Sequence, residues 1–507
     1  MPGSRMSMTD RPRPRHPALA ALLSFLLPGL GQAYAGDRLM ATVLAAPVLL
    51  LVVMGVLVAA VFADRLRNDV LSSPFLLGLL VLDAALLGWR LFAIAHAGLG
   101  RPLPAGRAAV DAAGTGSIGT AAVRPVMTQP VNVAIVAVLM FATIGMHAYA
   151  GVLVAGLNST LTQIFTPGGA ANGRAAGPLN KPDYRWNGTE RINFLLLGID
   201  SGPGRSEALT DTILVVSVDP VKRSAVLVSI PRDTGFMPLP DRRIYSDGRY
   251  PQKINQLSSD SGAKPSLWCS DLPKPGDCGI RTLERSVGLY LGINIQYYAR
   301  VDLEGFASLI DSLGGVDLCL PGKLVDPGYS GPTWYPRVGI ELAAGCQQYD
   351  GKHALAFARI RKGVMQLPGG KTEQQTDFTR ADRQQQVLLA LRKKLADANL
   401  VFALPGLLNA IGNTVTTDFP RSLAGDLASL LPLITGPEIQ RVVLAWPQYV
   451  DLPTNPTVNY LLIPKREAIR TQMRKLFGAA GPLQGWYVGS QAALPPAVSP
   501  TVAPSGR

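Results

Sequence analysis

Long apolar stretches dominate the first part of the chain and predict a membrane region at 17–157. Three of them, at 39–63, 73–97 and 131–157, reach the roughly 20 apolar residues that a bilayer-spanning helix needs. A shorter stretch at 18–34 is interrupted by a Pro-Gly-Leu-Gly run. We expect it to be a re-entrant or interfacial element, with a signal peptide as the alternative. The pattern therefore predicts an all-α membrane region of about three spans.

Arginine residues are distributed unevenly around these stretches. The tail at 1–16 is basic, and the loop between the last two spans carries Arg101, Arg107 and Arg124. An excess of Lys and Arg marks the cytoplasmic side of a membrane protein, so we place this tail and this loop in the cytoplasm. An odd number of crossings then puts the chain after about residue 158 outside the cytoplasm.

The composition agrees with a membrane protein. The 507 residues have a mean hydropathy of +0.21, and only 16% of them are charged, against roughly a quarter in soluble proteins. The net charge of +13 favours polyanionic partners such as phospholipid head groups and lipid-linked phosphates. No nucleic-acid-binding motif accompanies this charge, so we do not expect nucleic acid as a partner.

Beyond the membrane region the composition changes twice. Residues 158–190 are rich in Gly, Ala, Asn and Pro, and we interpret them as a linker. A folded domain outside the cytoplasm is expected over 191–488. The end at 489–507 is rich in Pro, Ala, Ser and Val and is predicted to be disordered.

Within 191–488, short runs of Val, Ile and Leu alternate with helical patterns. The runs predict strands at 194–198, 212–218, 225–230, 297–301 and 316–320. Apolar residues at helical spacing predict helices at 304–313 and 379–395. Thr379 and Asp382 form the expected capping box at the start of the second helix. This alternation favours an α/β fold with a central mixed sheet flanked by helices.

All cysteines of the chain lie in this domain, which suits disulfides in an oxidising compartment. We favour Cys269–Cys278 and Cys319–Cys346, because these residues are nearest in sequence. Four cysteines allow three pairings, and free thiols are the alternative. Their spacing does not resemble that of a zinc site.

Two aspartates lie at neighbouring strand ends. Asp200 follows the first predicted strand, and Asp211 precedes the second. Adjacent strand ends could bring both carboxylates to one Mg²⁺, a cation that prefers carboxylate and phosphate oxygens. The alternative is a pair of aspartates that cap turns, which are common at such positions.

Several arginines could bind a polyanion. Arg232 follows a strand together with Asp233, for which an ordinary surface ion pair is the alternative. Arg359 and Arg361 alternate along the chain, so they would share one face if they lay on a strand.

The predicted helix at 379–395 carries a second basic group. Arg380, Arg383 and Gln384 lie on one side of its first turn, where free backbone N–H groups also favour anions. Arginine suits phosphate because its planar donors can bind two oxygens at once. A solvated basic face is the alternative.

Histidine chemistry is not expected in the outer domain. His353 is the one histidine within 191–488, so neither a metal–histidine cluster nor a Ser–His triad has enough residues to support it. Its place in Gly351-Lys-His-Ala354 suits the start of a helix.

Taken together, the motifs between Asn193 and Leu395 resemble those of the LytR-CpsA-Psr family of cell-envelope enzymes. The resemblance depends on seven motifs in order: Leu195-Leu-Leu-Gly-Ile-Asp200, Thr210-Asp-Thr212, Ser229-Ile-Pro-Arg-Asp233, Lys253-Ile-Asn255, Ile310-Asp-Ser-Leu-Gly-Gly-Val-Asp317, Ala354-Leu-Ala-Phe-Ala-Arg-Ile-Arg361 and Arg380-Ala-Asp-Arg-Gln384. The chain departs from the family at Leu209-Thr-Asp211, where Arg-Ser-Asp is common, and Arg205 is the candidate substitute for the lost arginine.

The resemblance implies transfer of a phosphoglycan from a polyprenyl-diphosphate carrier to a cell-wall hydroxyl, typically on peptidoglycan. It implies a lipid tail in an apolar pocket between sheet and helices, and a Mg²⁺ held by Asp200 and Asp211 at the diphosphate. It assigns phosphate binding to a set of arginines and one glutamine, with Asp233 as a supporting residue. That set is Arg232, Arg359, Arg361, Arg380, Arg383 and Gln384.

Two other functions remain open. A hydrolase would use water as the acceptor of the same diphosphate. A non-catalytic membrane protein would keep the lipid pocket for binding or regulation alone. An assay for released polyprenyl phosphate distinguishes an enzyme from a non-catalytic binding protein. Supplying an acceptor glycan in the same assay distinguishes transfer from hydrolysis.

The topology yields a direct prediction. A reporter enzyme fused after Val488 should be active only when the reporter works outside the cytoplasm, because the arginine asymmetry fixes the orientation of the spans. The measurement is the activity of paired reporters, one active on each side of the membrane. Activity of the cytoplasmic reporter would contradict the topology.

Overall fold

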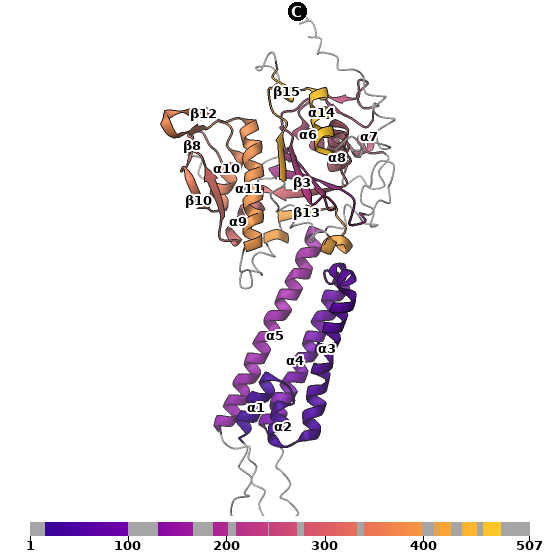
Figure 1. The fold of residues 1–507 in the computed structure, drawn as a ribbon, viewed down its shortest axis with the longest axis vertical. Helices are drawn as coiled ribbons and strands as arrows, with labels where there is room; N and C mark the ends of the chain where they lie inside the picture. Colours follow the sequence, from indigo (N-terminus) through magenta and orange to yellow (C-terminus); the bar gives the residue numbers. More distant parts are fainter. Residues whose placement is uncertain are drawn as a thin grey trace, which may run out of the picture. The chain divides into compact units, whose positions relative to one another are not determined.

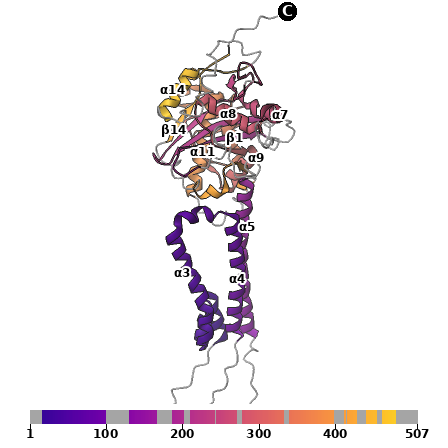
Figure 2. The ribbon, with the colours of Figure 1, turned by 90° about the vertical axis from the view of Figure 1, so that its right-hand side faces the viewer.

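A computed structural model describes residues 16–99, 130–165, 186–200, 209–241, 243–270, 278–331, 339–397, 410–412, 414–426, 439–453 and 460–477. The chain divides into two compact units, Met1–Ala155 and Gly156–Arg507. Each unit is described by itself below (Figures 1 and 2).

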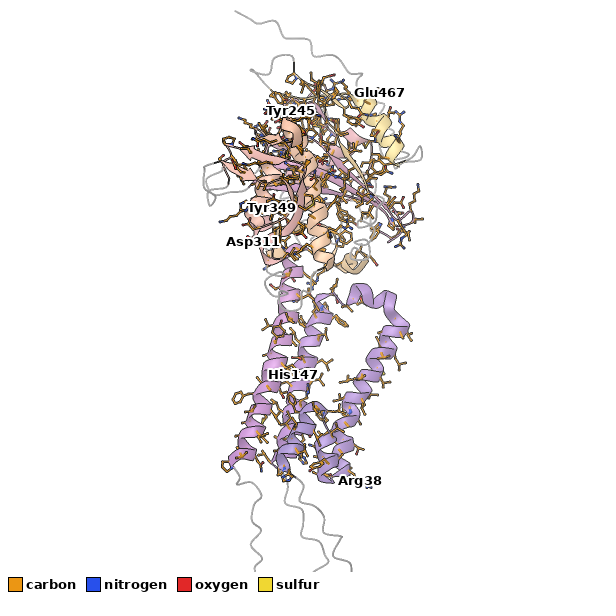
Figure 3. The ribbon with its side chains drawn as sticks, turned by 60° about the vertical axis from the view of Figure 1, so that its left-hand side comes forward. Arg38, His147, Tyr245, Asp311, Tyr349 and Glu467 are labelled. Carbon is orange, nitrogen blue, oxygen red and sulfur yellow. A yellow bond between two sulfur atoms is a disulfide. The ribbon has the colours of Figure 1, made fainter. Side chains whose placement is uncertain are left out.

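Three helices of the described residues are long and apolar enough to cross a membrane: α3 (Arg38–Asp69), α4 (Ser73–Gly98) and α5 (Pro130–Ile164). They coincide with the three predicted spans, although α5 continues beyond residue 157 into the range predicted as linker. Asp83 of α4 and His147 of α5 (Figure 3) lie 2.7 Å apart between Oδ1 and Nδ1. Polar pairs of this kind hold neighbouring helices together inside a bilayer.

The interrupted stretch forms two short helices, α1 (Pro17–Leu26) and α2 (Leu30–Ala35), neither of which is long enough to span a bilayer. Gly29 makes the break between them with a φ of +99°, a conformation that favours glycine. The Gln32 side chain donates to the Ala93 carbonyl at 2.8 Å and accepts from Ser24 Oγ at 3.0 Å. Polar groups at the break are therefore satisfied within the protein, as an interrupted apolar segment requires.

The second unit contains the mixed central sheet that the sequence predicted. It has six strands in the order β13-β6-β1-β2-β3-β14. Strands β1–β6 and β3–β14 pair in parallel and the other neighbours are antiparallel. The strands are β1 (Ile192–Asp200), β2 (Leu209–Asp219), β3 (Ser224–Ser229), β6 (Tyr297–Asp302), β13 (Val415–Thr417) and β14 (Ile439–Val443).

Both faces of the sheet are covered at its central strands, which explains why β1, β2 and β3 are largely apolar. Successive side chains of a strand point to opposite faces. Leu195 and Leu197 therefore join the core under α6 (Ile254–Ala263), α8 (Cys278–Leu291) and α14 (Arg466–Phe477) (Figure 1). Residues that alternate with these along the strand, such as Phe194, point to the other face of the sheet. There they join a second apolar cluster, which packs against α11 (Asp377–Asp397). Trp186 belongs to that cluster too, so the folded unit includes residues that were predicted as linker.

A smaller lobe packs beside α11 around its own apolar core. The predicted strand at 316–320 lies in this lobe as β7 rather than in the central sheet, because it pairs with β10. The elements of the lobe are α9 (Leu303–Ser312), β7 (Val316–Leu320), β8 (Lys323–Asp326), β9 (Ile340–Leu342), β10 (Gly345–Tyr349), α10 (Gly351–Arg359), β11 (Val364–Gln366), η4 (Pro368–Gly370) and β12 (Thr372–Gln374). Short elements complete the unit: β4 (Met237–Pro238), β5 (Arg249–Tyr250), α7 (Pro265–Trp268), η5 (Arg421–Leu423), β15 (Val450–Asp451) and β16 (Ile463–Pro464).

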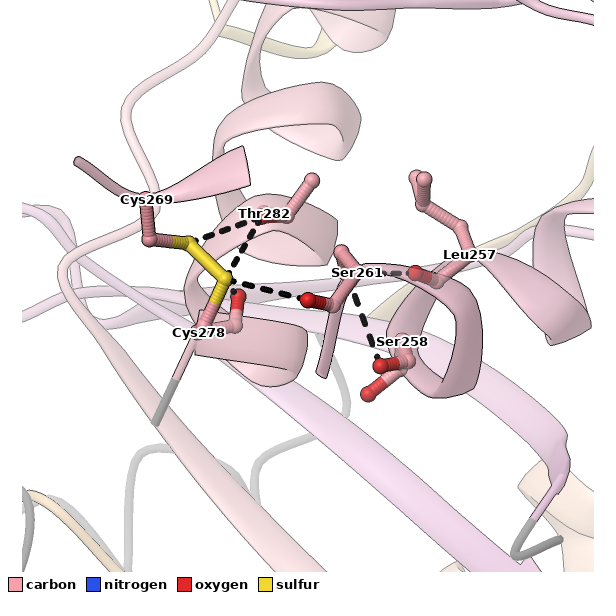
Figure 4. The surroundings of a disulfide bond; sticks show 6 residues. All are labelled: Leu257, Ser258, Ser261, Cys269, Cys278 and Thr282. Atoms are coloured by element: carbon pink, nitrogen blue, oxygen red, sulfur yellow. Dashed lines mark hydrogen bonds between the residues drawn. A yellow bond between two sulfur atoms is a disulfide. The ribbon is translucent and has the colours of Figure 1, made fainter. Parts of the chain in front are cut away.

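The cysteines form the two disulfides that sequence proximity favoured, Cys269–Cys278 and Cys319–Cys346. The first joins the end of α7 to the start of α8, beside Thr282 (Figure 4). The second links directly opposite residues of β7 and β10. Each bond closes a loop and so limits the freedom of the unfolded chain.

Helix α11 begins earlier than the sequence predicted. Its first residue is Asp377, and Thr376 and Thr379 bond reciprocally between side chain and backbone N–H at 2.9 and 3.3 Å. The expected capping box of Thr379 and Asp382 is therefore wrong by one helical turn. Asp382 instead lies 2.6 Å from the guanidinium of Arg441 in β14.

A buried ion triad ties α8 to the sheet. Arg281 Nη1 lies 2.7 Å from Glu284 Oε2 and 2.8 Å from Asp418 Oδ2, and all three residues are buried. Asp418 also accepts the backbone N–H of Tyr298 in β6 at 2.8 Å. One guanidinium cannot balance two buried carboxylates. Burial, against the attraction of Arg281 and with repulsion from Asp418, raises the pKa of Glu284 to about 8.

This triad predicts a pH-dependent stability. The folded pKa of Glu284 exceeds its ordinary value of 4.5, so its stabilising contribution is complete below pH 4.5 and is lost as the pH rises through about 8. The wild-type melting temperature should fall by a few degrees from pH 5.5 to pH 8.5. Glu284→Gln stays neutral and should flatten this decline. Equal slopes in the two proteins, measured by thermal unfolding across this range, would contradict the assignment.

Candidate functional site

A cavity of about 810 Å³ lies between the central sheet, α9, α10 and α11. Most of its lining is apolar and includes Leu196, Leu214, Val301, Phe306, Val387 and Leu391. Helix α11 contributes Arg380, Gln384, Val387 and Leu391 to the lining of the cavity. These residues recur at helical spacing, so one face of the helix runs along the length of the cavity. The first turn of α11 thus gives the cavity a charged end, and later turns give it an apolar one.

The charged end is an ion cluster built from three elements. Arg232, just after β3, lies 2.6 Å from Asp211 of β2 between Nη1 and Oδ1. Arg380, in the first turn of α11, donates to the Asp211 carbonyl at 2.9 Å and lies 2.8 Å from Asp377 Oδ1. Arg232 Nε lies 3.7 Å from the same Asp377 oxygen. Residues distant in sequence therefore converge at one end of the sheet.

A strand irregularity places Asp211 in this cluster. Gly198 of β1 pairs with Thr212, but Ile199 pairs with Thr210, so Asp211 is an extra residue in β2. Such a bulge re-aims a side chain at the edge of a sheet.

Burial shapes the electrostatics of the cluster. Burial lowers the pKa of Arg380, against the attraction of Asp377. For Arg232, burial is outweighed by Asp211, Asp377 and Asp233, which raise its pKa. Burial also raises the pKa of Asp377 despite the nearby Arg380. Although Arg380 lies close to Asp377, neither Asp377 oxygen has a well-oriented hydrogen bond from a described residue. Asp377 is thus a buried carboxylate with acceptor capacity to spare.

The cluster continues on the other side of Arg232. Asp233 Oδ1 lies 3.9 Å from Arg232 Nε and 2.7 Å from Lys253 Nζ. The Lys253 ammonium lies 5.9 Å from the ring centre of Tyr460.

The structure brings most of the predicted site residues to one cavity. Asp211, Arg232, Arg359, Arg361, Arg380 and Gln384 all line it. Their setting differs from the prediction in one respect. Arg359 ends helix α10 and Arg361 lies in the turn that follows, so the two do not share the face of a strand. The helix ends there because Ile360 leaves the helical conformation, with a ψ of 132°.

Arg383 differs from its predicted place. It does not line the cavity but is buried, and it donates to the carbonyl oxygens of Phe357 (2.7 Å) and Ile360 and to the side chain of Gln375. Burial, with repulsion from Arg380, lowers the pKa of Arg383 to about 10. Its donors are occupied by carbonyl groups at the end of α10 and by Gln375, so Arg383 holds the end of α10 with Arg359 and the turn with Arg361.

The proposed metal ligands are described only in part. The backbone of Asp200 pairs with Leu209 at the end of β1, on the strand next to Asp211. The Asp200 side chain and the whole of Arg205 lie outside the described residues. Among side chains that the structure does describe, no group of three or more His, Cys, Asp or Glu residues could hold a metal ion.

Asp377 and Lys253 are site residues that the sequence did not single out. Lys253 is the first residue of the motif Lys253-Ile-Asn255, and Asp377 lies three residues before the motif Arg380-Ala-Asp-Arg-Gln384. Asp377 was missed because the helix was expected to begin at Thr379.

Part of the chain is similar to known proteins. A profile of the LytR_cpsA_psr family matches residues 169–469. The chain is 28% identical over 287 residues to a polyisoprenyl-teichoic acid–peptidoglycan teichoic acid transferase TagU of Bacillus mycoides, covering 56% of this chain and 77% of that one. It is 30% identical over 246 residues to TagU of Oceanobacillus iheyensis, covering 48% of this chain and 62% of the relative.

Solved structures are also similar to part of the chain. A crystal structure of TagV from Bacillus subtilis aligns with a TM-score of 0.41 and 22% identity, over 57% of this chain and 97% of that one. A structure described as TagT bound to LIIa-WTA aligns with a TM-score of 0.40 and 18% identity, over 61% and 96% of the two chains.

The position of Arg383 predicts a loss of stability on conservative substitution. Arg383→Lys should lower the free energy of unfolding by about 1–3 kcal/mol, because one ammonium cannot reach all the buried acceptors that the guanidinium binds. Arg361→Lys is the control. Arg361 is half-buried on the turn, and we expect a change within about 0.5 kcal/mol. Denaturant unfolding measures both, and equal effects would contradict the structural role of Arg383.

Proposed function

Because the chain belongs to the LytR_cpsA_psr family, we propose that it transfers a phosphoglycan from a polyprenyl-diphosphate carrier to a cell-wall hydroxyl, with peptidoglycan as the acceptor. The curated relatives are named as transferases of teichoic acid to peptidoglycan, which supports this substrate class. The observation that carries the proposal is the cavity of about 810 Å³, apolar along most of its length and charged at one end. A polyprenyl tail and its diphosphate need those two environments side by side.

The charged end supplies what phosphoryl transfer requires. Such reactions depend on positioning the phosphates and on neutralising the charge that develops. Arg232, Arg359, Arg361 and Arg380 line the cavity, and guanidinium groups bind phosphate oxygens in pairs. Gln384 adds an amide one helical turn beyond Arg380. These groups would hold the diphosphate while the tail occupies the apolar lining.

The reaction then exchanges one P–O bond for another. The acceptor oxygen bonds to the sugar-linked phosphorus, the bond from that phosphorus to the bridging oxygen breaks, and polyprenyl phosphate leaves. The acceptor proton goes to Asp377 in this proposal, since its carboxylate oxygens lack well-oriented donors among the described residues and burial raises its pKa. A base with a raised pKa holds a proton better near neutral pH.

The donor set at the strand ends suits Mg²⁺ in kind. Asp211 supplies a carboxylate, and Asp200 lies at the end of the neighbouring strand. Two carboxylates completed by phosphate oxygens and water are a usual set of ligands for this cation. When bound, Mg²⁺ would neutralise charge on the diphosphate. Asp211 is already paired with Arg232, so this arginine would hold the carboxylate in place for the cation.

The three apolar helices suggest that the protein is anchored in a membrane. In the proposed function this anchor keeps the cavity near a lipid-linked substrate. The catalytic unit would face the outside of the cytoplasmic membrane, where peptidoglycan lies.

The test uses the full-length protein in detergent with a polyprenyl-diphosphate-linked glycan labelled in its sugar. Adding soluble peptidoglycan oligomers should yield labelled oligomers and an equal amount of polyprenyl phosphate. Arg380→Gln should lower the rate by about a hundredfold, since it removes a preorganised charged donor. Lys222→Gln, at an exposed turn, is the matched control.

Further arms of the same assay separate the alternatives. Chelation of divalent cations, and Asp211→Asn, should each remove most of the transfer. Full activity under chelation would overturn the role of Mg²⁺. Polyprenyl phosphate release that does not depend on the acceptor would identify a hydrolase, and no release at all would identify a binding protein.

A further inference from the structure

Tyr460 is an exposed aromatic residue beside the ion cluster. Its side chain is 37% exposed, and the backbone just after it is fixed against the chain that follows Arg232. Leu462 donates its N–H to the Asp233 carbonyl at 2.9 Å, and its own carbonyl accepts from Gly235 at 2.9 Å. These bonds hold the segment that carries Tyr460 beside Arg232.

Two charged groups accompany the ring. Lys253 Nζ lies 5.9 Å from the ring centre and 2.7 Å from Asp233 Oδ1. Burial, followed by repulsion from Asp233 and Asp377, raises the pKa of Tyr460, so its phenol stays protonated at neutral pH. The Lys253 ammonium therefore lies over one face of the Tyr460 ring, and the Asp233 carboxylate that it contacts and the phenol hydroxyl add polar groups near the ring.

Arg232 separates this group from the cavity. Its Nη1 meets Asp211, and both residues line the cavity, whereas its Nε lies 3.9 Å from Asp233 Oδ1. Asp233, Lys253 and Tyr460 are not among the lining residues of that cavity in the described part of the chain. The ion cluster thus has one side toward the cavity and another toward Tyr460.

The chemistry of transfer gives the second side a role. In phosphoryl transfer the attacking and leaving oxygens lie roughly in line with the phosphorus. If the leaving polyprenyl phosphate occupies the cavity, the attacking hydroxyl must approach from the opposite side. An aromatic ring packs against the C–H face of a sugar, and polar groups at its rim can bind the sugar hydroxyls.

We infer that Tyr460, Lys253 and Asp233 form a binding site for a sugar ring of the acceptor glycan, with Tyr460 as its apolar floor. The inference rests on the proposed transfer reaction and adds the side from which the acceptor enters. Lys253 and Asp233 orient the acceptor hydroxyls, and the attacking oxygen then lies on the Asp377 side of the arginine cluster.

The test measures transfer by the full-length protein in detergent, with soluble peptidoglycan oligomers as the varied substrate. Tyr460→Ala should raise the acceptor KM by about three- to tenfold, the range expected for one aromatic contact. The kcat and the KM for the polyprenyl-linked donor should change by less than about twofold, because Tyr460 does not line the cavity. Tyr460→Phe keeps the ring and should retain most of the acceptor affinity.

Trp446→Ala is the matched control, since Trp446 is also an exposed aromatic residue, at 52% exposure. We expect an acceptor KM within about twofold of wild type, as for most surface substitutions. An unchanged KM in Tyr460→Ala would overturn the inference, as would an equal rise in Trp446→Ala or in Tyr460→Phe.

Binding of the oligomers without donor, measured by calorimetry, keeps this inference separate from the proposed function. Weaker binding to Tyr460→Ala than to wild type and to Trp446→Ala supports the acceptor site even where no transfer is seen. Equal binding to all three proteins overturns it. A wild-type protein that binds oligomers but transfers nothing would overturn the proposed reaction alone.

Discussion

The shape of the site depends on the contacts that Arg380 makes. It extends from the first turn of α11 to β2, where it donates to the Asp211 carbonyl, and it pairs with Asp377 of its own turn. Gln385 extends the attachment to β3 and β14 through Ser229 and the Val442 carbonyl. Protein interiors are otherwise close-packed, so a helix that borders a large cavity needs such fixed points. The polar first turn anchors α11, and its apolar turns then line the space beside the sheet.

Positive and negative side chains balance each other in the same ion cluster. Arg232, Arg380 and Lys253 face Asp211, Asp233 and Asp377, so positive and negative side chains are equal in number within this described group. Buried charges are tolerated when they are paired in this way. In the proposed reaction a diphosphate would add negative charge to a balanced cluster. The cations that would balance this added charge are Arg359 at the end of α10, Arg361 in the turn after it, and the proposed Mg²⁺.

Arg383 shows how that turn is held. Its guanidinium binds carbonyl groups at the end of α10, including that of Phe357, and also contacts the Phe357 ring face at 5.6 Å. An arginine in a motif that was predicted to bind phosphate can therefore support the site without lining its cavity. Its five donors allow it to satisfy several carbonyls at once, which a lysine cannot do.

Much of this architecture could be predicted from local patterns. The apolar lengths predicted the three long helices, the Val- and Ile-rich runs predicted β1, β2, β3 and β6, and proximity in sequence predicted both disulfides. These features depend on neighbours along the chain. The motifs also singled out most residues that line the charged end of the cavity.

Only the tertiary structure decided which motif residues face the cavity. Arg380 and Arg383 are three positions apart, so they lie about 60° apart around the helix axis, and this rotation turns Arg383 from the cavity toward α10. Tertiary structure also decided that the site region includes Asp377, Lys253 and Tyr460. Their contacts with Arg232, Asp233 and each other connect segments far apart in the chain, and such contacts exist only once the sheet has placed its strand ends together.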